Sequence, residues 1–371
     1  MGTLLYPEPK TKPGLYDWLD ERLGISDVIA LAKHKTVPQH RHSFWYYWGG
    51  LSLFFFIIQL FTGILLLVYF RPGKDAYDSV RQITYDIDFG WLIRSVHSWS
   101  ANLMVFAVCV HMFSAFFMKA YQKPREFAWW SGLVLLLLTL VFGFSGYLLP
   151  MDELSFVATK IGLQFSNMIP VVGPVLADLI RGGPQVSPDT VQRFFALHVV
   201  VLPLLFLPLL MFHLFLVQKH GNASPPGEES RPASEKQTMP FFPNFFAMDL
   251  GMWLIALNVI TILATLFPWD LGPQADPLAS APNGIHPEWY FMPPFHLLKI
   301  IGRFVPGVTG ELLGMGLFAA VLIFWTLVPL FDPKGKAGRA GRFVTWGGVL
   351  VLSGMILLIA LGYADLGYTH L

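Results

Sequence analysis

The sequence predicts an all-α, polytopic membrane protein, and three observations lead to this fold class. Of 371 residues, 54% are hydrophobic and only 13% are charged, whereas a soluble domain has about 25% charged residues. The stretch from Phe194 to Gln218 contains no charged residue. Seven apolar segments are long enough to span a bilayer, which takes about 20 helical residues: 45–69, 91–118, 129–149, 194–217, 246–267, 311–331 and 343–363.

Basic residues predict the orientation of these spans. If the N-terminus is cytoplasmic, the segments on that side carry 16 Lys and Arg, and the longer segments on the opposite side carry eight. The positive-inside rule therefore places the N-terminus in the cytoplasm and the C-terminus outside. The net charge of +1 argues against nucleic acid as a partner.

The chain divides into four parts. Residues 1–44 form a polar cytoplasmic segment, in which partly helical apolar spacing over 14–35 predicts a helix on the membrane surface; a soluble lead-in is the alternative. Residues 45–217 hold four spans, and residues 246–371 hold three. Between them, 218–245 is a Pro/Ser/Glu-rich linker without periodicity.

Cys109 is the only cysteine. It excludes a disulfide within the chain, a Cys-x-x-Cys-His haem attachment and a cysteine-ligated iron–sulfur cluster. We interpret Cys109 as a small apolar packing residue.

Four histidines fall at two matched depths of the predicted bundle. His97 and His111 are 14 positions apart, which leaves them about 40° apart around one helix. His198 and His213 are 15 positions apart, roughly 22 Å along a helix, and helix distortion at the two prolines between them would absorb the extra offset. Both histidine-bearing helices are predicted to run from the outer to the cytoplasmic face of the membrane. His97 therefore pairs with His198 near the outer face, and His111 with His213 near the inner face.

Two stacked bis-histidine centres indicate two non-covalent b-type haems. A porphyrin supplies its own equatorial ligands and needs only two axial imidazoles, whereas zinc requires four ligands at one depth. Glycines 14 positions apart repeat the histidine period, and glycine allows a flat group to approach the backbone. Small-residue helix packing, the alternative, uses a spacing of four. These glycines are Gly49 and Gly63 in one span and Gly132 and Gly146 in another.

Two arginines lie near the histidine levels. Arg94 is close to His97, and Arg125 follows the same span on the inner side. A guanidinium suits carboxylates, so both are candidates to bind haem propionates. Snorkelling to the membrane interface is the alternative for each.

The chain resembles cytochrome b of the Rieske/cytochrome b complexes, from YDWLDERL at 16–23 to the end of the last span. The motifs that carry the resemblance are GWLIRSVHSWSANLM at 90–104, KPREFAWW at 123–130, GFSGYLLPMD at 143–152, RFFALHVVVLP at 193–203 and HPEWYF at 286–291. The 15-residue histidine spacing and the seven spans resemble the chloroplast-type branch. There, the four-helix and three-helix parts are separate polypeptides; here they are fused, which suggests a bacterial form in the cytoplasmic membrane.

The resemblance implies a proton-translocating quinol–cytochrome c, or plastocyanin-like, oxidoreductase. Quinol would be oxidised near the outer face by a Pro-Glu-Trp-Tyr loop, with Glu288 accepting a proton and Tyr290 holding the site beside Pro287 and Trp289. One electron would pass to a Rieske iron–sulfur protein and then to a c-type cytochrome. The other would cross both haems to an inner quinone. The family also implies a homodimeric complex.

Two family features are altered in this sequence. Candidates for the inner quinone site are Asp17, Asp20, Arg22 and Lys219, and an ordinary solvated charge cluster is the alternative for each. Gln218 stands where the chloroplast-like branch has arginine before that lysine. That branch also attaches an extra haem through a cysteine just before the paired glycines of the first span. The residue here is Tyr47, so no covalently attached haem is expected.

Two other functions fit part of the pattern. A dihaem membrane anchor of a dehydrogenase or hydrogenase also uses histidines in spans, but has no reason to carry the 286–291 loop. A transporter would use its histidines as a proton relay and would bind no haem.

Overall fold

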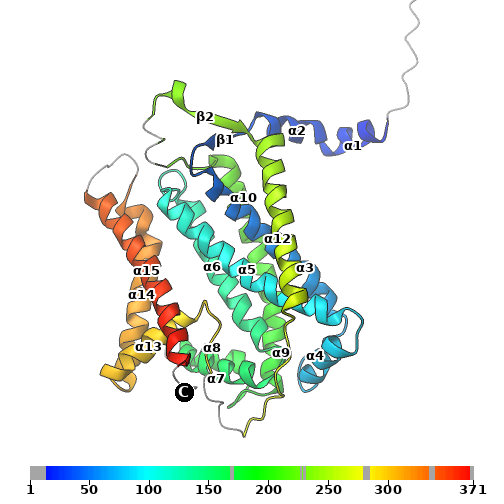
Figure 1. Cartoon of the computed structure of the whole chain (residues 1–371), viewed down its shortest axis with the longest axis vertical. Helices are drawn as coiled ribbons and strands as arrows, with labels where there is room; N and C mark the ends of the chain where they lie inside the picture. The colour runs from blue at the N-terminus through cyan, green and yellow to red at the C-terminus, as the bar shows by residue number, and fades with distance from the viewer. Residues whose placement is uncertain are drawn as a thin grey trace, which may run out of the picture.

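The computed structural model describes residues 14–167, 171–225, 228, 231–278, 285–333 and 339–367 and is mainly helical (Figure 1). Within this described part, seven helices are long and apolar enough to cross a membrane. The predicted fold class and number of spans are therefore confirmed. Residues 1–13 and part of the predicted linker lie outside the described residues. The spans are Ser43–Leu67, Gly90–Phe117, Glu126–Tyr147, Pro188–His220, Phe241–Leu266, Val308–Phe331 and Gly341–Asp365.

The first four spans form a bundle around a shared apolar core. Helices are the form these segments take, because hydrocarbon leaves backbone polar groups no partner except each other. Buried Leu51, Phe55, Met104 and Phe206 pack together in this core. The helices of the bundle are α3 (Tyr47–Leu67), α5 (Gly90–Phe117), α6 (Glu126–Tyr147), and the continuous α9 (Pro188–Ala196), η2 (Leu197–Val201) and α10 (Leu202–His220).

The remaining spans pack on two sides of this bundle. Helix α12 (Phe246–Leu266) contacts α3 and α5. Helices α14 (Val308–Phe331) and α15 (Arg339–Gly367) contact α6 and α5 through an aromatic cluster in which the rings of Phe116 and Trp325 stack with centroids 4.6 Å apart. The two halves of the chain therefore share cores.

The two ends of the bundle carry different structures (Figure 1). One end carries a two-stranded antiparallel sheet of β1 (Thr36–Gln39) and β2 (Gln237–Pro240), two strands that are far apart in the sequence. We call it the hairpin end, after the shape of this strand pair. The sequence alone does not predict this sheet, because β2 lies in the Pro/Ser/Glu-rich linker. The opposite end, which we call the α7 end, carries the short helices α4 (Ala76–Tyr85), α7 (Glu153–Asn167), α8 (Gly173–Arg181) and α13 (Met292–Phe304).

The predicted surface helix over 14–35 is two helices, α1 (Leu15–Leu23) and α2 (Ile25–His34). Gly24 separates them: its φ of 60° lies in the left-handed region, and its N–H donates to the carbonyl of Asp20 at 2.8 Å. This is a common way for glycine to end a helix. Figure 1 shows α1 extending away from the bundle at the hairpin end.

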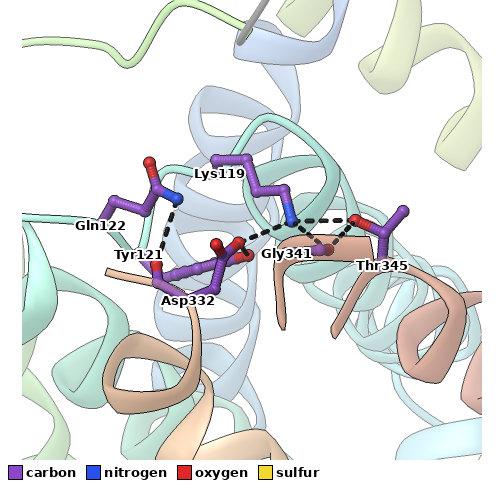
Figure 2. A network of polar contacts seen from close by, with 6 residues as sticks. All are labelled: Lys119, Tyr121, Gln122, Asp332, Gly341 and Thr345. Atoms are coloured by element: carbon purple, nitrogen blue, oxygen red, sulfur yellow. Dashed lines mark hydrogen bonds and ion pairs between the residues drawn. The ribbon is translucent and has the colours of Figure 1, made fainter. Parts of the chain in front are cut away.

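A buried polar network joins the two halves at the hairpin end (Figure 2). The Nζ of Lys119 donates to Asp332 at 2.7 Å and to Thr345 Oγ1 at 2.9 Å. The hydroxyl of Tyr121 donates to the same Asp332 oxygen at 2.6 Å. Only 14% of the Lys119 side chain and 4% of the Asp332 side chain are exposed. The Lys119 ammonium and the Asp332 carboxylate therefore neutralise each other, because little solvent reaches either.

Two tryptophans of α6 make further links to α14. Trp129 Nε1 donates to the carbonyl of Trp325 at 3.0 Å, and Trp130 Nε1 to the carbonyl of Thr326 at 2.8 Å. The first carbonyl needs a partner because Pro329, four residues later, has no N–H to offer it. Trp129 thus gives the Trp325 carbonyl the hydrogen bond that the proline cannot provide.

We predict that Asp332→Asn destabilises the protein by about 3 kcal/mol or more, because it leaves the Lys119 charge buried without its counter-ion. Thermal unfolding in detergent micelles measures the effect. Asp178→Asn is the control: its side chain is 68% exposed beside Arg181, so the change should cost less than about 1 kcal/mol.

The double variant Lys119→Met/Asp332→Asn tests the cause. It removes the unpaired charge, while the new amide oxygen can still accept from Tyr121. It should recover most of the lost stability. Equal destabilisation of the single and double variants would contradict the ion-pair explanation.

Candidate functional site

His97 and His198 lie on facing helices toward the α7 end, within electrostatic range of each other. His97 is in α5, and its Nδ1 lies 2.8 Å from the hydroxyl of Thr62 in α3. His198 is in η2, and its Nδ1 lies 3.0 Å from the hydroxyl of Ser145 in α6. Four helices thus supply the two rings and their hydroxyl partners.

His111 and His213 form the second pair, toward the hairpin end. Their ring centroids are 6.5 Å apart and their planes are at 86°. An imidazole nitrogen binds a metal at about 2.0–2.1 Å, so this separation suits one metal atom between two facing rings. The Nδ1 of His213 lies 2.9 Å from the hydroxyl of Ser131.

A π-helical turn accounts for the 15-residue spacing of His198 and His213. Helix α5 is continuous between its two histidines, so 14 residues are enough there. In the other helix, η2 from Leu197 to Val201 is wound as π-helix and directly precedes Leu202–Pro203. A π turn inserts one residue without turning the rest of the helix to another face. His198 therefore lies in the distortion itself.

Each predicted glycine faces a histidine of a different helix. A Cβ added at Gly146 would lie 2.8 Å from Cε1 of its facing ring, and at Gly49 or Gly132 3.1 Å; at Gly63 the distance is 3.5 Å. The clearance these glycines provide is thus occupied by the imidazole rings. In the order Gly49, Gly63, Gly132 and Gly146, the facing rings are His111, His97, His213 and His198.

The donor sets fit haem better than a metal bound by protein alone. No group of three or more His, Cys, Asp or Glu that would hold a metal ion occurs among the described residues. Two imidazoles meeting across a glycine-lined space match a cofactor that brings its own equatorial ligands.

The two predicted propionate-binding arginines already hold backbone carbonyls. Buried Arg94 donates to the carbonyls of Trp269 at 2.5 Å and Asp270 at 3.1 Å. Arg125 donates to the carbonyl of Gly221 at 3.1 Å. Each anchors the segment that follows a membrane helix, and the propionate role stays a prediction for both arginines.

The segment 286–291, which we call the Glu288 loop, inserts between α5 and α6. Trp289 Nε1 donates to Oδ1 of Asn102 in α5 at 3.0 Å. The hydroxyl of Tyr290 lies against Gly143 in α6, where a Cβ would be 2.6 Å from it. Asn102 follows His97 by five residues, and Gly143 lies three residues before the glycine that faces His198. The loop therefore adjoins the His97–His198 pair.

Glu288 is the charged residue of this loop. Burial raises the pKa of its carboxyl, and His286 opposes the shift. The Nδ1 of His286 lies 3.0 Å from the carbonyl of Pro287, which precedes the carboxylate. Tyr147 and Tyr363 both lie within electrostatic range of Glu288. The carboxylate thus lies near two tyrosines, and its raised pKa suits it to accept a proton.

Asp249 is a second, half-buried carboxylate, which the sequence prediction did not include. Its Oδ1 is buried without a hydrogen-bond partner among the described residues, as are the indole nitrogens of Trp48 and Trp253. It lies so close to Gly50 that a Cβ there would clash with the carboxylate. Gly50 adjoins Gly49, the glycine that faces His111. Asp249 therefore lies at the depth of the His111–His213 pair. Its position near the start of an apolar span was the available signal.

The predicted inner-site residues do not gather around Asp249. Asp17 accepts a hydrogen bond from the N–H of Gly14 at the start of its own helix α1, and Asp20 accepts one from the N–H of Ser26 at the start of α2. Arg22 donates to Glu21 and to the Trp18 carbonyl. These three candidates lie in α1, which extends away from the bundle (Figure 1), whereas Lys219, the fourth candidate, lies near the end of α10.

Tyr47, which lies within electrostatic range of Asp249, and the two residues Gln218 and Lys219 near the end of α10 have defined contacts. The ring of Tyr47 stacks on Phe245 with centroids 4.9 Å apart, and its hydroxyl donates to Met248 Sδ at 3.1 Å. Gln218 accepts a hydrogen bond from Lys35. The ammonium of Lys219 lies 6.0 Å from the ring centre of Phe215.

By class, this is a helical membrane protein with seven candidate spans and with histidines paired inside its bundle. Two family models match the chain: cytochrome b/b6/petB over residues 32–221 and cytochrome b (C-terminal)/b6/petD over residues 274–368. The chain belongs to the cytochrome b family and is a cytochrome b subunit of a bc-type complex, which implies oxidoreductase activity within a complex of several subunits.

Relatives extend this assignment over most of the chain. The cytochrome b subunit of a Chlorobaculum thiosulfatiphilum cytochrome bc complex is 46% identical over 350 residues, covering 94% of this chain and 80% of its own. Cytochrome b of Rhodobacter capsulatus is 33% identical, covering 94% and 84%. Cytochrome b6 of Acaryochloris marina is 40% identical over 212 residues, covering 57% of this chain and 98% of its own.

A solved structure supports the same fold. A chain of a hyperthermophilic respiratory Complex III matches with a TM-score of 0.76 and 25% identity, over 95% of this chain and 100% of that chain. The predicted resemblance to cytochrome b is therefore confirmed.

We predict that Gly146→Ala lowers the amount of haem bound per protein, because the new Cβ would displace the ring of His198. Haem content by the pyridine haemochrome assay measures the loss. Gly251→Ala in α12 is the control, since a Cβ there meets nothing within 4 Å. The same haem content in both variants would show that the clearance at Gly146 is not needed.

Proposed function

We propose that the chain oxidises quinol at the Glu288 loop and reduces a quinone beside Asp249, with electrons passing between the two sites through the bundle. One observation carries the proposal: each histidine pair has one half-buried carboxylate beside it, and the pairs lie at two depths. His97 and His111 are 14 residues apart in the continuous helix α5, or about 21 Å.

Two non-covalent b-type haems would supply the one-electron carriers that connect the two sites. His97 and His198 would hold one haem, and His111 and His213 the other, each ring held against its glycine. Arg94 and Arg125 would contribute N–H groups to the propionates. With Tyr47 in place of the attaching cysteine and Cys109 packed beside the aromatic cluster, no covalent haem is proposed.

The Glu288 loop would bind quinol and remove its proton. Trp289 and Tyr290 fix the loop to α5 and α6, so the carboxylate is held at a constant position. Its raised pKa brings its proton affinity closer to that needed by a general base near neutral pH. Pro287 limits the backbone freedom of the residue next to it.

The distribution of basic residues supports an orientation with the hairpin end in the cytoplasm. In a bacterial cytoplasmic membrane, protons from quinol would then leave on the outer side, where the C-terminus lies. Protons for the quinone near Asp249 would come from the cytoplasm. Oxidation and reduction on opposite sides make the reaction proton-translocating.

The proposed partners are a Rieske iron–sulfur protein and a c-type cytochrome, in a homodimeric complex. The names of relatives, a cytochrome bc complex and a respiratory Complex III, support partners of this kind. The lipid bilayer and a quinone complete the set.

The alternative is a dihaem anchor of a dehydrogenase or hydrogenase. Such an anchor needs one quinone site at most and no loop like 286–291 beside its second histidine pair. The packing of Trp289 and Tyr290 onto the bundle favours the two-site function.

We predict that the purified protein shows two low-spin b-type signals in optical and EPR spectra. His198→Ala should remove one signal and His213→Ala the other, because each variant deletes an axial ligand of a different haem. Loss of no signal in either variant, or no haem in the wild-type protein, would sink the haem assignment and favour a proton-relay role for the histidines.

We predict that substitutions of the two carboxylates, Glu288 and Asp249, slow different steps of electron transfer. Glu288→Gln should slow haem reduction by quinol about 100-fold or more. In the wild type this rate should rise with pH through the raised pKa of Glu288, because only the carboxylate accepts a proton; the variant should lose this rise. Asp249→Asn should leave haem reduction intact and slow re-oxidation by quinone.

Stopped-flow spectroscopy follows both steps, and Glu153→Gln at the α7 end is the matched control. If Glu288→Gln kept the wild-type rate and pH profile, the role of the Glu288 loop would be wrong. If Asp249→Asn slowed only the quinol step, the two sites would have to be exchanged.

A further inference from the structure

His286 is the residue of the Glu288 loop to which the proposed function gives no role. It precedes Glu288 by two positions, and Pro287 between them has a fixed φ, which limits how far the two side chains can move apart. The imidazole acts electrostatically on the Glu288 carboxylate, against the burial that raises the pKa of this group. The two side chains therefore lie close enough for a proton on one to affect the other.

The hydrogen bond made by the His286 ring determines which of its nitrogens carries the hydrogen. Its Nδ1 lies 3.0 Å from the carbonyl of Pro287, and a carbonyl oxygen can only accept. Nδ1 therefore carries the hydrogen in the neutral ring, and Nε2 keeps a free lone pair. The ring thus presents a proton acceptor on the side that faces away from the Pro287 carbonyl.

Tyr363 of α15 contacts the same imidazole. The two ring centroids are 5.4 Å apart and the ring planes are at 71°, an edge-to-face geometry that stabilises aromatic pairs. The imidazole is half-buried, whereas the Tyr363 side chain is 41% exposed. His286 therefore lies between the Glu288 carboxylate and the surface of the molecule.

Charged side chains near Tyr363 indicate the level that water reaches. Asp365, two residues further along α15, pairs with Lys299 and Arg303 of α13, and all three side chains are partly exposed. Charged groups are costly in hydrocarbon, so these ion pairs mark the boundary between membrane and water at the α7 end. A proton on the His286 ring has solvent within reach.

His296 is a second histidine at this end, and its surroundings are different. Its side chain is only 5% exposed, and it lies in α13 within electrostatic range of Asp365. Its Cβ lies 3.6 Å from the position that a Cβ on Gly362 would take. His296 therefore belongs to the packing of α13 against α15, and His286 is the histidine that acts on Glu288.

We propose that His286 takes over the proton that Glu288 removes from quinol and delivers it to water on the outer side of the membrane. The proposal rests on the quinol site of the proposed function and adds a second proton acceptor to it. A half-buried carboxyl whose pKa is raised holds its proton after one turnover. It needs a neighbouring base before it can accept the next proton.

The proton moves in three steps, and neither side chain changes its oxidation state. A quinol hydroxyl gives its proton to the Glu288 carboxylate, while the electrons of quinol leave to the electron acceptors of the proposed function. The Glu288 carboxyl gives this proton to Nε2 of His286, which restores the carboxylate and forms an imidazolium. Nε2 then releases the proton to water, and the neutral ring keeps its hydrogen on Nδ1.

First-turnover and steady-state kinetics of the purified complex separate the two acceptors. His286→Asn keeps an N–H near the place of Nδ1 and removes the basic Nε2. Started above the raised pKa of Glu288, its first-turnover haem reduction by quinol should keep the wild-type rate. Later turnovers should slow about 10-fold or more, because the Glu288 carboxyl is not emptied. Glu288→Gln should slow the first turnover as well.

Proton release provides a second measurement. In vesicles with a pH-sensitive dye on the outer side of the complex, acidification should follow first-turnover haem reduction promptly in the wild type and lag behind it in His286→Asn. Added imidazole should shorten the same lag in His286→Ala and restore its steady-state rate. Tyr363→Phe is the matched control: it keeps the ring contact and the imidazole, so it should behave as the wild type does.

The outcomes separate this inference from the proposed function. Wild-type rates and prompt proton release in His286→Asn would overturn the relay and leave the quinol site standing. A slowed first turnover in His286→Asn would also overturn it, because the ring would then only shape the loop. A wild-type first turnover in Glu288→Gln would overturn the proposed function itself. A normal first turnover followed by slow turnovers, with rescue of His286→Ala by imidazole, would support the inference.

Discussion

The structure depends on the need to satisfy polar rings inside an apolar span. Each imidazole lies within an apolar span, so neighbouring helices must supply space for it, and for three of the four rings they also supply a hydrogen-bonding hydroxyl. The pairs Thr62–Gly63, Ser131–Gly132 and Ser145–Gly146 do both with two adjacent residues: glycine admits the ring, and the hydroxyl binds its Nδ1. This requirement fixes the rotation of α3 and α6 relative to the histidine-bearing helices.

The three-helix part then determines where the substrates can bind. Helix α12 brings Asp249 against Gly50 of α3, and the Glu288 loop reaches Asn102 and the face of α6 at Gly143. Neither carboxylate belongs to the bundle that holds the histidines. The bundle therefore supplies the carriers, and the later helices supply the groups that handle protons.

Much of this arrangement could be predicted from the sequence, because it depends on helical period. The 14-residue repeats of histidine and glycine need only straight helices to align, and His97, His111, Gly49 and Gly63 lie on two of them. The π turn at His198 could not be predicted in that way, because it arises from local winding before Pro203. The pairing of β1 with β2 depends on contacts between segments about 200 residues apart. Asp249 was overlooked because it lies near the end of a span, where a lone carboxylate resembles an interfacial residue.

Contacts outside the linker also hold the two halves together. Cytochrome b6 of Acaryochloris marina matches almost entirely within 57% of this chain, so the four-helix part exists elsewhere as a whole polypeptide. In this protein the halves are joined by the Lys119–Asp332 pair, by Trp129 on the Trp325 carbonyl, and by Arg94 on the carbonyls after α12. All of these contacts are made by residues outside the linker. A covalent connection raises the effective concentration of one half near the other, but the position of Glu288 and Asp249 beside the histidine pairs follows from side-chain packing.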